Sequence, residues 1–248
     1  MMSSQSNSNT KEAVLVTGGS HGIGRAIVER LIADGMHVIN FDKVPPLAVA
    51  ADESYFQVDV SGEKGLRSAL ADAVAKFNIT RLVNNAGIVR RANIDKTTTE
   101  DLQAVMSVNI AAAIICVQAL LPTMRAAHFG RIVNIASRAA LGKEERIVYA
   151  TTKAGLLGLT RTLALELATD GITVNAIGPG PIATELFQSA NPPGAPATQR
   201  ILASIPLGRI GQPEEVAHLV ASLLDSRAGF TTGQVVYVCG GMTVGLTQ

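Results

Sequence analysis

Three polar residues near the middle of the chain, Ser137, Tyr149 and Lys153, have the types and spacing of a proton-transfer site. Tyr149 and Lys153 lie four residues apart where the apolar spacing predicts a helix, so their side chains should share one face. A free tyrosine has a pKa near ~10, and an adjacent cation favours its phenolate form. Lowering that pKa by about three units requires roughly 4 kcal/mol of stabilisation. Ser137 ends an apolar strand and could hydrogen-bond the same substrate oxygen. A Y-x-x-x-K pattern also arises by chance on amphipathic helices, so the preceding sequence has to support this interpretation.

A glycine-rich turn near the start of the chain has the features of a dinucleotide cradle. Residues 14–16 are an apolar run typical of a strand, residues 17–24 form the turn, and residues 25–33 a helical pattern closed by Gly35. A second strand, residues 37–41, ends in Asp42. Glycines let backbone amides approach a pyrophosphate, and a helix N-terminus favours negative charge. The spacing is T-G-x-x-x-G-x-G rather than G-x-G-x-x-G. A tight turn without a ligand is the alternative, but the order strand, turn, helix, strand and acid favours a cofactor site.

Taken in order, these motifs resemble the short-chain dehydrogenase/reductase family from about residue 13 to residue 242. Asn84-Asn85-Ala86-Gly87 is similar to the family's N-N-A-G after its fourth strand, which stabilises the central sheet. The resemblance implies a catalytic tetrad of Asn109, Ser137, Tyr149 and Lys153. The residues it implies at the cofactor, besides Tyr149 and Lys153, are Thr17, Gly18, Ser20, His21, Gly22, Ile23, Gly24, Asp42, Asp59, Val60, Asn85, Ala86, Gly87, Pro179, Gly180, Ile182 and Thr184.

The resemblance also implies one role for each catalytic residue. Tyr149 is expected to be the general acid in reduction and the general base in oxidation, while Ser137 holds the substrate oxygen. Lys153 is expected to lower the tyrosine pKa and grip the nicotinamide ribose, with Asn109 holding a water that links Lys153 to solvent. Ser137 and Tyr149 lie 12 positions apart, one fewer than in many relatives. We expect a shortened loop there and an intact site.

Asp42 predicts the choice between the two nicotinamide cofactors. An acid at the end of the second strand can accept hydrogen bonds from the adenosine ribose and would repel a 2′-phosphate, so it favours NAD over NADP. Relatives that prefer NADP usually carry a basic residue where this chain has His21. Lys43, directly after Asp42, leaves NADP open as the alternative.

Composition is consistent with a single domain. The chain has 248 residues, of which 47% are hydrophobic and 17% charged, enough to bury a sizeable core. A formal charge of +1 provides no basic field for nucleic acid. The four histidines and two cysteines do not form a cluster with metal-ligand spacing, so we expect no metal site.

The N-terminal segment, the length of the apolar runs and the two cysteines predict the cellular compartment. Residues 1–10 are polar and predict a disordered tail without the regions of a signal peptide. No run is expected to reach the length of a membrane span. Cys116 and Cys239 are expected to pack as small apolar side chains rather than bridge. These features predict a cytoplasmic protein that does not bind membranes.

The alternation of apolar runs with helical patterns predicts the fold. Strand-like runs occur at Val14, Val38, Leu82, Ile132, Ile172 and Val235. The sequence therefore predicts a single doubly wound α/β domain of the Rossmann type, residues 11–248, whose parallel sheet is covered by helices on both faces. The helix usual between Asp42 and Asp59 should shrink to about one turn, because Pro45-Pro46 interrupts a short segment.

Two long helices, residues 101–126 and 149–168, are apolar on more than one side. In the family such helices pair subunits, so the resemblance implies a homotetramer. The alternative is that the sheet and neighbouring helices cover them within a monomer.

The sequence gives few indications of the substrate. By resemblance, residues 185–207 form a lid over the substrate. Arginines recur near the predicted site and could bind an anionic substrate or carrier: Arg90, Arg91, Arg138 and Arg146. The alternative is that Arg138 and Arg146 pair with Glu144 and Glu145 at the surface.

The sequence therefore predicts an oxidoreductase that transfers a hydride between NAD(H) and a small-molecule secondary alcohol or ketone. One alternative is an NADPH-dependent 3-oxoacyl carrier-protein reductase, which the stretches NNAGIVR and GRIVNIAS also resemble. The other is a non-catalytic dinucleotide-sensing protein on the same fold.

Overall fold

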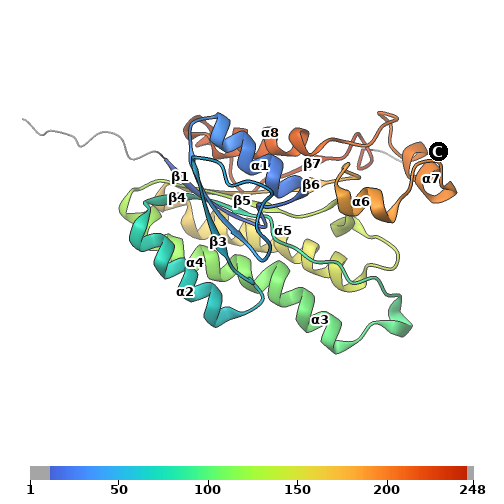
Figure 1. The fold of residues 1–248 in the computed structure, drawn as a ribbon, viewed down its shortest axis with the longest axis horizontal. Coiled ribbons are helices and arrows are strands. Elements are labelled where there is room, and N and C mark those ends of the chain that lie inside the picture. The colour runs from blue at the N-terminus through green and yellow to red at the C-terminus, as the bar shows by residue number, and fades with distance from the viewer. Residues whose placement is uncertain (1–11, 245–248) are drawn as a thin grey trace, which may run out of the picture.

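The computed structural model describes residues 12–244 and has a seven-stranded parallel sheet at its centre (Figure 1). The strand order is β3-β2-β1-β4-β5-β6-β7. This doubly wound order confirms the predicted fold class, and it places a topological switch point between β1 and β4, where α/β sheets bind ligands. The strands are β1 (Ala13–Thr17), β2 (His37–Asp42), β3 (Glu53–Gln57), β4 (Ile79–Asn84), β5 (Gly130–Ile135), β6 (Ile172–Pro179) and β7 (Val235–Val238).

Helices cover both faces of the sheet, as Figure 1 shows. On one face α1 (Gly22–Ala33) packs against α8 (Pro213–Leu224). On the other lie α2 (Glu63–Lys76), α3 (Thr99–Met106), α4 (Ala112–Ala126) and α5 (Ile147–Leu167). Alternation along the strands builds a core in each layer: Val14 and Val16 pack with α1 and α8, and Leu15 packs on the opposite side.

The strand β3 was missed by the sequence prediction. Its residues, ESYFQ, are mostly polar because it is an edge strand. The buried carboxylate of Glu53 accepts hydrogen bonds from the Arg25 and Asn40 side chains. The segment from β2 to β3 contains no helix, where about one turn was expected. Its two prolines remove backbone donors that a helical turn would use.

The segment before β5 forms a longer helical stretch than α4 alone. A π-helical insertion, Ser107–Ala111, joins α3 to α4, and the whole stretch Thr99–Ala126 has 28 residues with a mean hydropathy of 2.2 in its most apolar window. By length and composition it could cross a membrane, so the expectation that no run reaches that length was wrong. Packing accounts for the apolar character, because α4 lies against α2 and β4 with Cys116, Leu120 and Met124 fully buried.

The predicted environment of the cysteines is confirmed, since Cys116 and Cys239 are both buried and free. Burial raises the pKa of the Cys116 thiol to about 12, which keeps it protonated and unreactive. The predicted disordered tail, residues 1–10, lies outside the described residues.

Candidate active site

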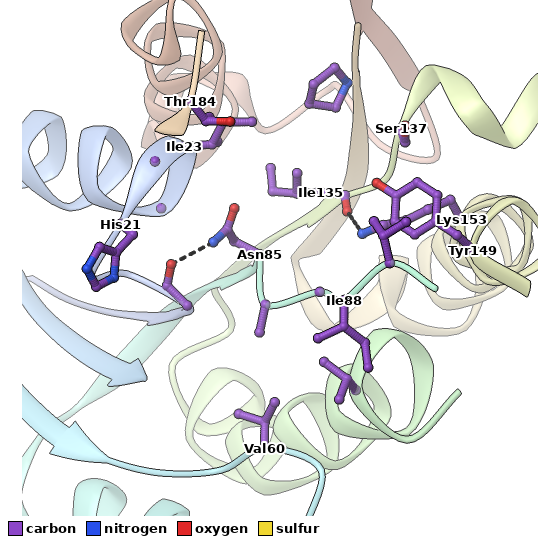
Figure 2. Close-up of a pocket in the computed structure, with 18 of the residues that line it drawn as sticks. His21, Ile23, Val60, Asn85, Ile88, Ile135, Ser137, Tyr149, Lys153 and Thr184 are labelled. Atoms are coloured by element: carbon purple, nitrogen blue, oxygen red, sulfur yellow. Dashed lines mark hydrogen bonds between the residues drawn. The ribbon is translucent and has the colours of Figure 1, made fainter. Parts of the chain in front are cut away.

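A large pocket opens at the carboxyl ends of the central strands, beside the switch point between β1 and β4. It has a volume of about 1380 Å³, more than the roughly 300–1,000 Å³ usual for small-molecule sites. Figure 2 shows His21, Ile23 and Thr184 on one side of the pocket and Ser137, Tyr149 and Lys153 on the other. The predicted site residues that line it are Gly18, His21, Gly22, Ile23, Gly24, Asp42, Asp59, Val60, Asn85, Ala86, Gly87, Ser137, Tyr149, Lys153, Pro179, Gly180, Ile182 and Thr184.

Two glycines of the turn have a backbone conformation that other residues rarely adopt. Gly18 and Gly22 have φ values of +69° and +53°, in the left-handed region that favours glycine. At Gly24 an added Cβ would lie 1.8 Å from the Gly18 carbonyl oxygen. The turn is therefore packed against itself, which leaves the start of α1 open toward the pocket.

Thr17 and Asn85 tie this turn to the end of β4. The Thr17 hydroxyl oxygen accepts hydrogen bonds from the backbone N–H groups of Asn85 and Ala86, both at 3.1 Å. The Asn85 side-chain amide donates to the carbonyl oxygens of Thr17 and Gly18 at 3.0 and 2.9 Å. Thr17 is buried and does not line the pocket, so it shapes the cradle from behind.

Asn40 is a supporting residue that the sequence prediction missed. Its side-chain oxygen accepts from the Gly19 N–H at 3.0 Å, and its amide donates to the Ser20 hydroxyl at 3.2 Å. Ser20 is buried outside the pocket wall and supports the turn through these bonds rather than lining it. The available signal was a fully buried polar residue inside the apolar strand HVINFD, because such a group needs internal partners.

Asp42 lies at the end of β2 with its carboxylate held in place. One oxygen accepts from the Ser20 N–H at 3.0 Å and the other from the Val44 N–H at 3.2 Å. The neighbouring Lys43 ammonium is 3.0 Å from a carboxylate oxygen of Asp59. A hydrogen bond from the Ser61 side chain, and to a smaller extent Lys43, lower the pKa of Asp59 to about 2. Lys43 is thus already paired with an acid at this end of the pocket.

The tyrosine and the serine meet despite the short loop between them. Ser137 follows β5, Tyr149 lies in the first turn of α5, and both side chains line the same part of the pocket. Burial raises the pKa of Tyr149, and the Ser137 side chain and the charge of Arg146 offset that rise in part. The resemblance implied that Lys153 would lower the Tyr149 pKa. The Lys153 nitrogen lies 5.7 Å from the Tyr149 ring centroid and donates to the Ile135 carbonyl oxygen at 2.6 Å (Figure 2).

Lys153 is buried, and burial lowers its pKa from 10.5 to about 8. Below pH 8 the ammonium is charged in both the folded and the unfolded chain, and the cost of burying it is fully present. Between pH 8 and 10.5 the folded protein loses this proton first, while the unfolded chain still binds it. Stability from this group therefore rises with pH across that window.

We expect this effect to be measurable as a difference between two variants. The single variant Tyr149→Phe keeps Lys153, and the double variant Tyr149→Phe/Lys153→Met lacks it. We expect the free energy of unfolding of the single variant, relative to the double variant, to rise by about 3 kcal/mol from pH 7.5 to 11. The phenylalanine background removes the Tyr149 phenol, which would titrate in the same range. Urea unfolding at several pH values measures the difference, and a value independent of pH would contradict a depressed Lys153 pKa.

Asn109 lies behind the pocket rather than on its wall. Its side-chain oxygen accepts from the Ile88 N–H at 2.9 Å, and its amide donates to the Ile88 carbonyl at 3.2 Å and the Thr152 hydroxyl at 3.0 Å. The Thr152 hydroxyl in turn donates to the Tyr149 carbonyl oxygen at 2.8 Å. Asn109 therefore joins the segment after N-N-A-G to α5 beside Tyr149, in the π-helical insertion. Thr152 was not predicted from the sequence.

The four arginines near the site have different surroundings. Arg90 lines the pocket but is paired with Asp101 at 3.8 Å, and Arg138 lies outside the pocket wall. Arg91 and Arg146 both line the pocket. Within residues 12–244 neither Arg138 nor Arg146 forms an ion pair with Glu144 or Glu145, so that expected surface pairing is wrong.

The predicted lid residues form two short helices, α6 (Glu185–Ala190) and α7 (Pro196–Ala203). Glu185, Phe187 and Asn191 line the pocket. Gly180, just after β6, is packed so closely that an added Cβ would lie 2.8 Å from the Cys239 Cα. This close packing fixes the strand end from which the segment leaves the sheet.

The residues present fit a dinucleotide cofactor. The glycine turn can present its backbone to a pyrophosphate, the Asp42 carboxylate lies at the end of β2 for ribose hydroxyls, and the pocket continues without interruption to Tyr149. Its volume also leaves room for a substrate next to Ser137 and Tyr149.

Comparison with known proteins agrees with this arrangement. Residues 18–243 match the family model described as enoyl-(acyl carrier protein) reductase. The chain is 38% identical to a 3-oxoacyl-[acyl-carrier-protein] reductase of Synechocystis sp., over 95% of this chain and 98% of that protein. It is 40% identical to an acetoacetyl-CoA reductase of Rhizobium meliloti, over 92% and 96%. The solved structure of ElxO with NADP bound superposes with a TM-score of 0.87 at 30% identity, covering 94% of this chain and 99% of that one.

Proposed function

Because the chain belongs to the short-chain dehydrogenase/reductase family and is an NAD(P)-dependent oxidoreductase of CH–OH groups or ketones, we propose that it interconverts a secondary alcohol and a ketone with NAD(H) as its preferred cofactor. The observation that carries the proposal is a single pocket with the Asp42 carboxylate at one end and the Ser137 and Tyr149 hydroxyl groups at the other (Figure 2). The bound cofactor supplies or accepts the hydride at the substrate carbon.

Tyr149 is the proton donor in reduction and the proton acceptor in oxidation. Figure 2 shows its hydroxyl directed into the pocket beside Ser137. A ketone oxygen placed between the two hydroxyl groups would accept hydrogen bonds from both, which polarises the carbonyl group. The buried environment strengthens these hydrogen bonds, because little water competes for them.

Lys153 and Asn109 support the catalytic pair Ser137 and Tyr149. The Lys153 ammonium is within reach of a ribose placed over the pocket floor, and Gly87 leaves the approach open, since an added Cβ would lie 3.3 Å from the lysine nitrogen. Asn109 is a positioning residue, because its polar atoms hold Ile88 and Thr152. The water link to Lys153 that the resemblance implied for Asn109 stays a prediction.

The preference for NAD rests on charge at the adenosine end of the pocket. The Asp42 carboxylate is fixed by two backbone N–H groups and would face a 2′-phosphate with like charge. Lys43 is paired with Asp59, and Arg25 with Glu53 at 3.1 Å, so both cations already have acidic partners. Ribose hydroxyls, in contrast, can donate to Asp42 directly.

Titration of the purified protein with NADH and NADPH, followed by fluorescence, tests this preference. We expect NADH to bind at least about tenfold more tightly, which corresponds to roughly 1.4 kcal/mol. Asp42→Ser should narrow or reverse the difference, while the control Asp72→Ser, an exposed acid on α2 outside the pocket, should not. Equal or tighter binding of NADPH by the unmodified protein would overturn the NAD proposal.

A second candidate is reduction of 3-oxoacyl thioesters, favoured by the similarity to a 3-oxoacyl-[acyl-carrier-protein] reductase and an acetoacetyl-CoA reductase. The same residues would serve it, and ElxO was solved with NADP. Assays of 3-oxobutanoyl-CoA and simple ketones with each cofactor separate the candidates. The single-domain organisation, a substrate lid at 185–207, a homotetramer and a cytoplasmic location remain predictions.

A further inference from the structure

Two arginines at the substrate end of the pocket have surroundings that the proposed chemistry does not explain. Arg91 and Arg146 both line the pocket close to Tyr149. In the part of the chain that the structure describes, neither has a carboxylate oxygen within ion-pair distance. Among residues 12–244, the Arg146 side chain forms one hydrogen bond, from a guanidinium nitrogen to the Glu145 backbone carbonyl oxygen at 2.9 Å.

The backbone brings the two arginines together from distant parts of the sequence. Ala92 and Arg146 form an isolated parallel bridge, in which the Ala92 N–H donates to the Glu145 carbonyl oxygen at 3.2 Å. Glu145 adopts a left-handed φ of +54°, a conformation that costs a non-glycine residue energy and is found mostly where the surroundings require it. The bridge fixes the segment after N-N-A-G against the start of α5.

The charge of Arg146 is affected by burial and by its neighbour Arg91. Burial, and then the like charge of Arg91, lower the pKa of Arg146, and Glu145 and Tyr149 offset that shift only in part. Arg146 is partly buried and Arg91 is exposed at the pocket wall. Together they can bind an oxyanion, because each guanidinium group presents several N–H donors in a fixed plane. An anion between them would also remove their mutual repulsion.

We propose that Arg91 and Arg146 form an anion subsite, and that the substrate carries a carboxylate or phosphate group there, close to its reacting carbon. This inference rests on the proposed function, because it places the acidic group relative to Tyr149. Arg146 lies three residues before Tyr149, and its charge acts on the phenol. The distance from the reacting carbonyl carbon to the acidic group is therefore short, as in a small oxo acid and its hydroxy acid.

Steady-state kinetics on three related ketones test the subsite, with the more tightly bound cofactor. The substrates are 3-oxobutanoate, which has a carboxylate, its neutral ethyl ester, and 3-oxobutanoyl-CoA, whose phosphates lie far from the ketone. We expect kcat/KM to favour 3-oxobutanoate over the ester. Arg146→Gln and Arg91→Gln should each lower that acid-to-ester ratio roughly 10- to 100-fold, the value of one charged hydrogen bond. Arg146→Lys should restore part of it.

The ratio is the informative quantity, because Arg146 also influences the Tyr149 pKa and its loss affects every substrate. The matched control is Arg161→Gln, an exposed arginine on the same helix outside the pocket, which should leave the ratio unchanged. A ratio that changes only for 3-oxobutanoyl-CoA relative to the ester would overturn an anion subsite close to the reacting carbon, because the phosphates of that substrate lie far from its ketone. Equal turnover of acid and ester, unaffected by either variant, would overturn the anion subsite and leave the proposed function standing.

If none of these ketones is turned over, that result counts against the proposed function. A binding measurement then tests the anion subsite separately. Calorimetric titration of the protein saturated with reduced cofactor uses acetate, 3-oxobutanoate and inorganic phosphate as probes. We expect at least one anion to bind the unmodified protein and to bind the double variant Arg91→Gln/Arg146→Gln at least tenfold more weakly. Absence of binding, or equal binding to both proteins, would overturn the subsite.

Discussion

Replacing Tyr149 by phenylalanine is expected to lower kcat by roughly a thousandfold, within the 10²- to 10⁴-fold range of general acid–base catalysis. The substitution removes one hydroxyl group and keeps the ring, so packing against Lys153, 5.7 Å from the ring centroid, is preserved. Ser137 and Arg146 remain, but neither can replace the proton that Tyr149 exchanges with the substrate oxygen. The rate is measured in both directions with the best alcohol and ketone.

Cofactor binding separates a chemical defect from a structural one. Tyr149→Phe should bind NADH within about threefold of the unmodified protein, since the glycine turn and Asp42 are unaffected. The matched control is Tyr237→Phe, a tyrosine of β7 outside the pocket wall, which should keep full activity. Substantial turnover by Tyr149→Phe would contradict the assignment of Tyr149 as the proton donor.

Replacing Gly24 by alanine is expected to abolish measurable cofactor binding and to destabilise the protein by about 3 kcal/mol, at the upper end for overpacking. The added methyl group would lie 1.8 Å from the Gly18 carbonyl oxygen and 2.6 Å from the Asn85 side-chain nitrogen. The first of these is backbone and cannot turn aside as a side chain could. Relief requires the turn to move, which also breaks the Asn85 hydrogen bonds to Thr17 and Gly18.

Fluorescence titration with NADH and urea unfolding together measure this effect. Gly65→Ala is the control, because that glycine lies on α2 with nothing within 4 Å of an added Cβ. It should bind cofactor normally and gain roughly 0.5 kcal/mol, as alanine loses less backbone freedom in a helix. If Gly24→Ala bound cofactor like Gly65→Ala, the turn would not be the rigid cradle described above.

The residues predicted for the site came largely from motifs whose members are close in sequence. The glycine turn lies within eight residues, and Tyr149 and Lys153 are one helical turn apart. Such spacing constrains geometry directly, because a turn or helix fixes the relative positions of its own residues. The resemblance extended this to Asp59, Val60 and the residues after β6, which do line the pocket.

The errors and omissions concern burial and contacts between distant segments. Thr152 and the strand β3 have no local signature, and Asn40 is marked only as a polar residue within an apolar strand. The places of all three follow from partners in other elements. The charge of Arg146 offsets part of the rise that burial causes in the Tyr149 pKa, an interaction that was not predicted, and Lys153 donates to Ile135 on another element. The expected effect of Lys153 on the tyrosine stays a prediction. Thr17, Ser20 and Asn109 support the pocket from behind, a distinction that motif spacing does not contain.

The sequence alone determined the alternation of strands and helices, the glycine turn and the pairing of Tyr149 with Lys153, because hydrophobic period and local backbone geometry follow from neighbouring residues. Only the tertiary structure decided which charges meet. Arg91 and Arg146, 55 positions apart, come together through the bridge at Ala92, and Lys43 is paired with Asp59. The physical reason is that electrostatic interaction depends on distance in space and on burial, and chain folding sets both.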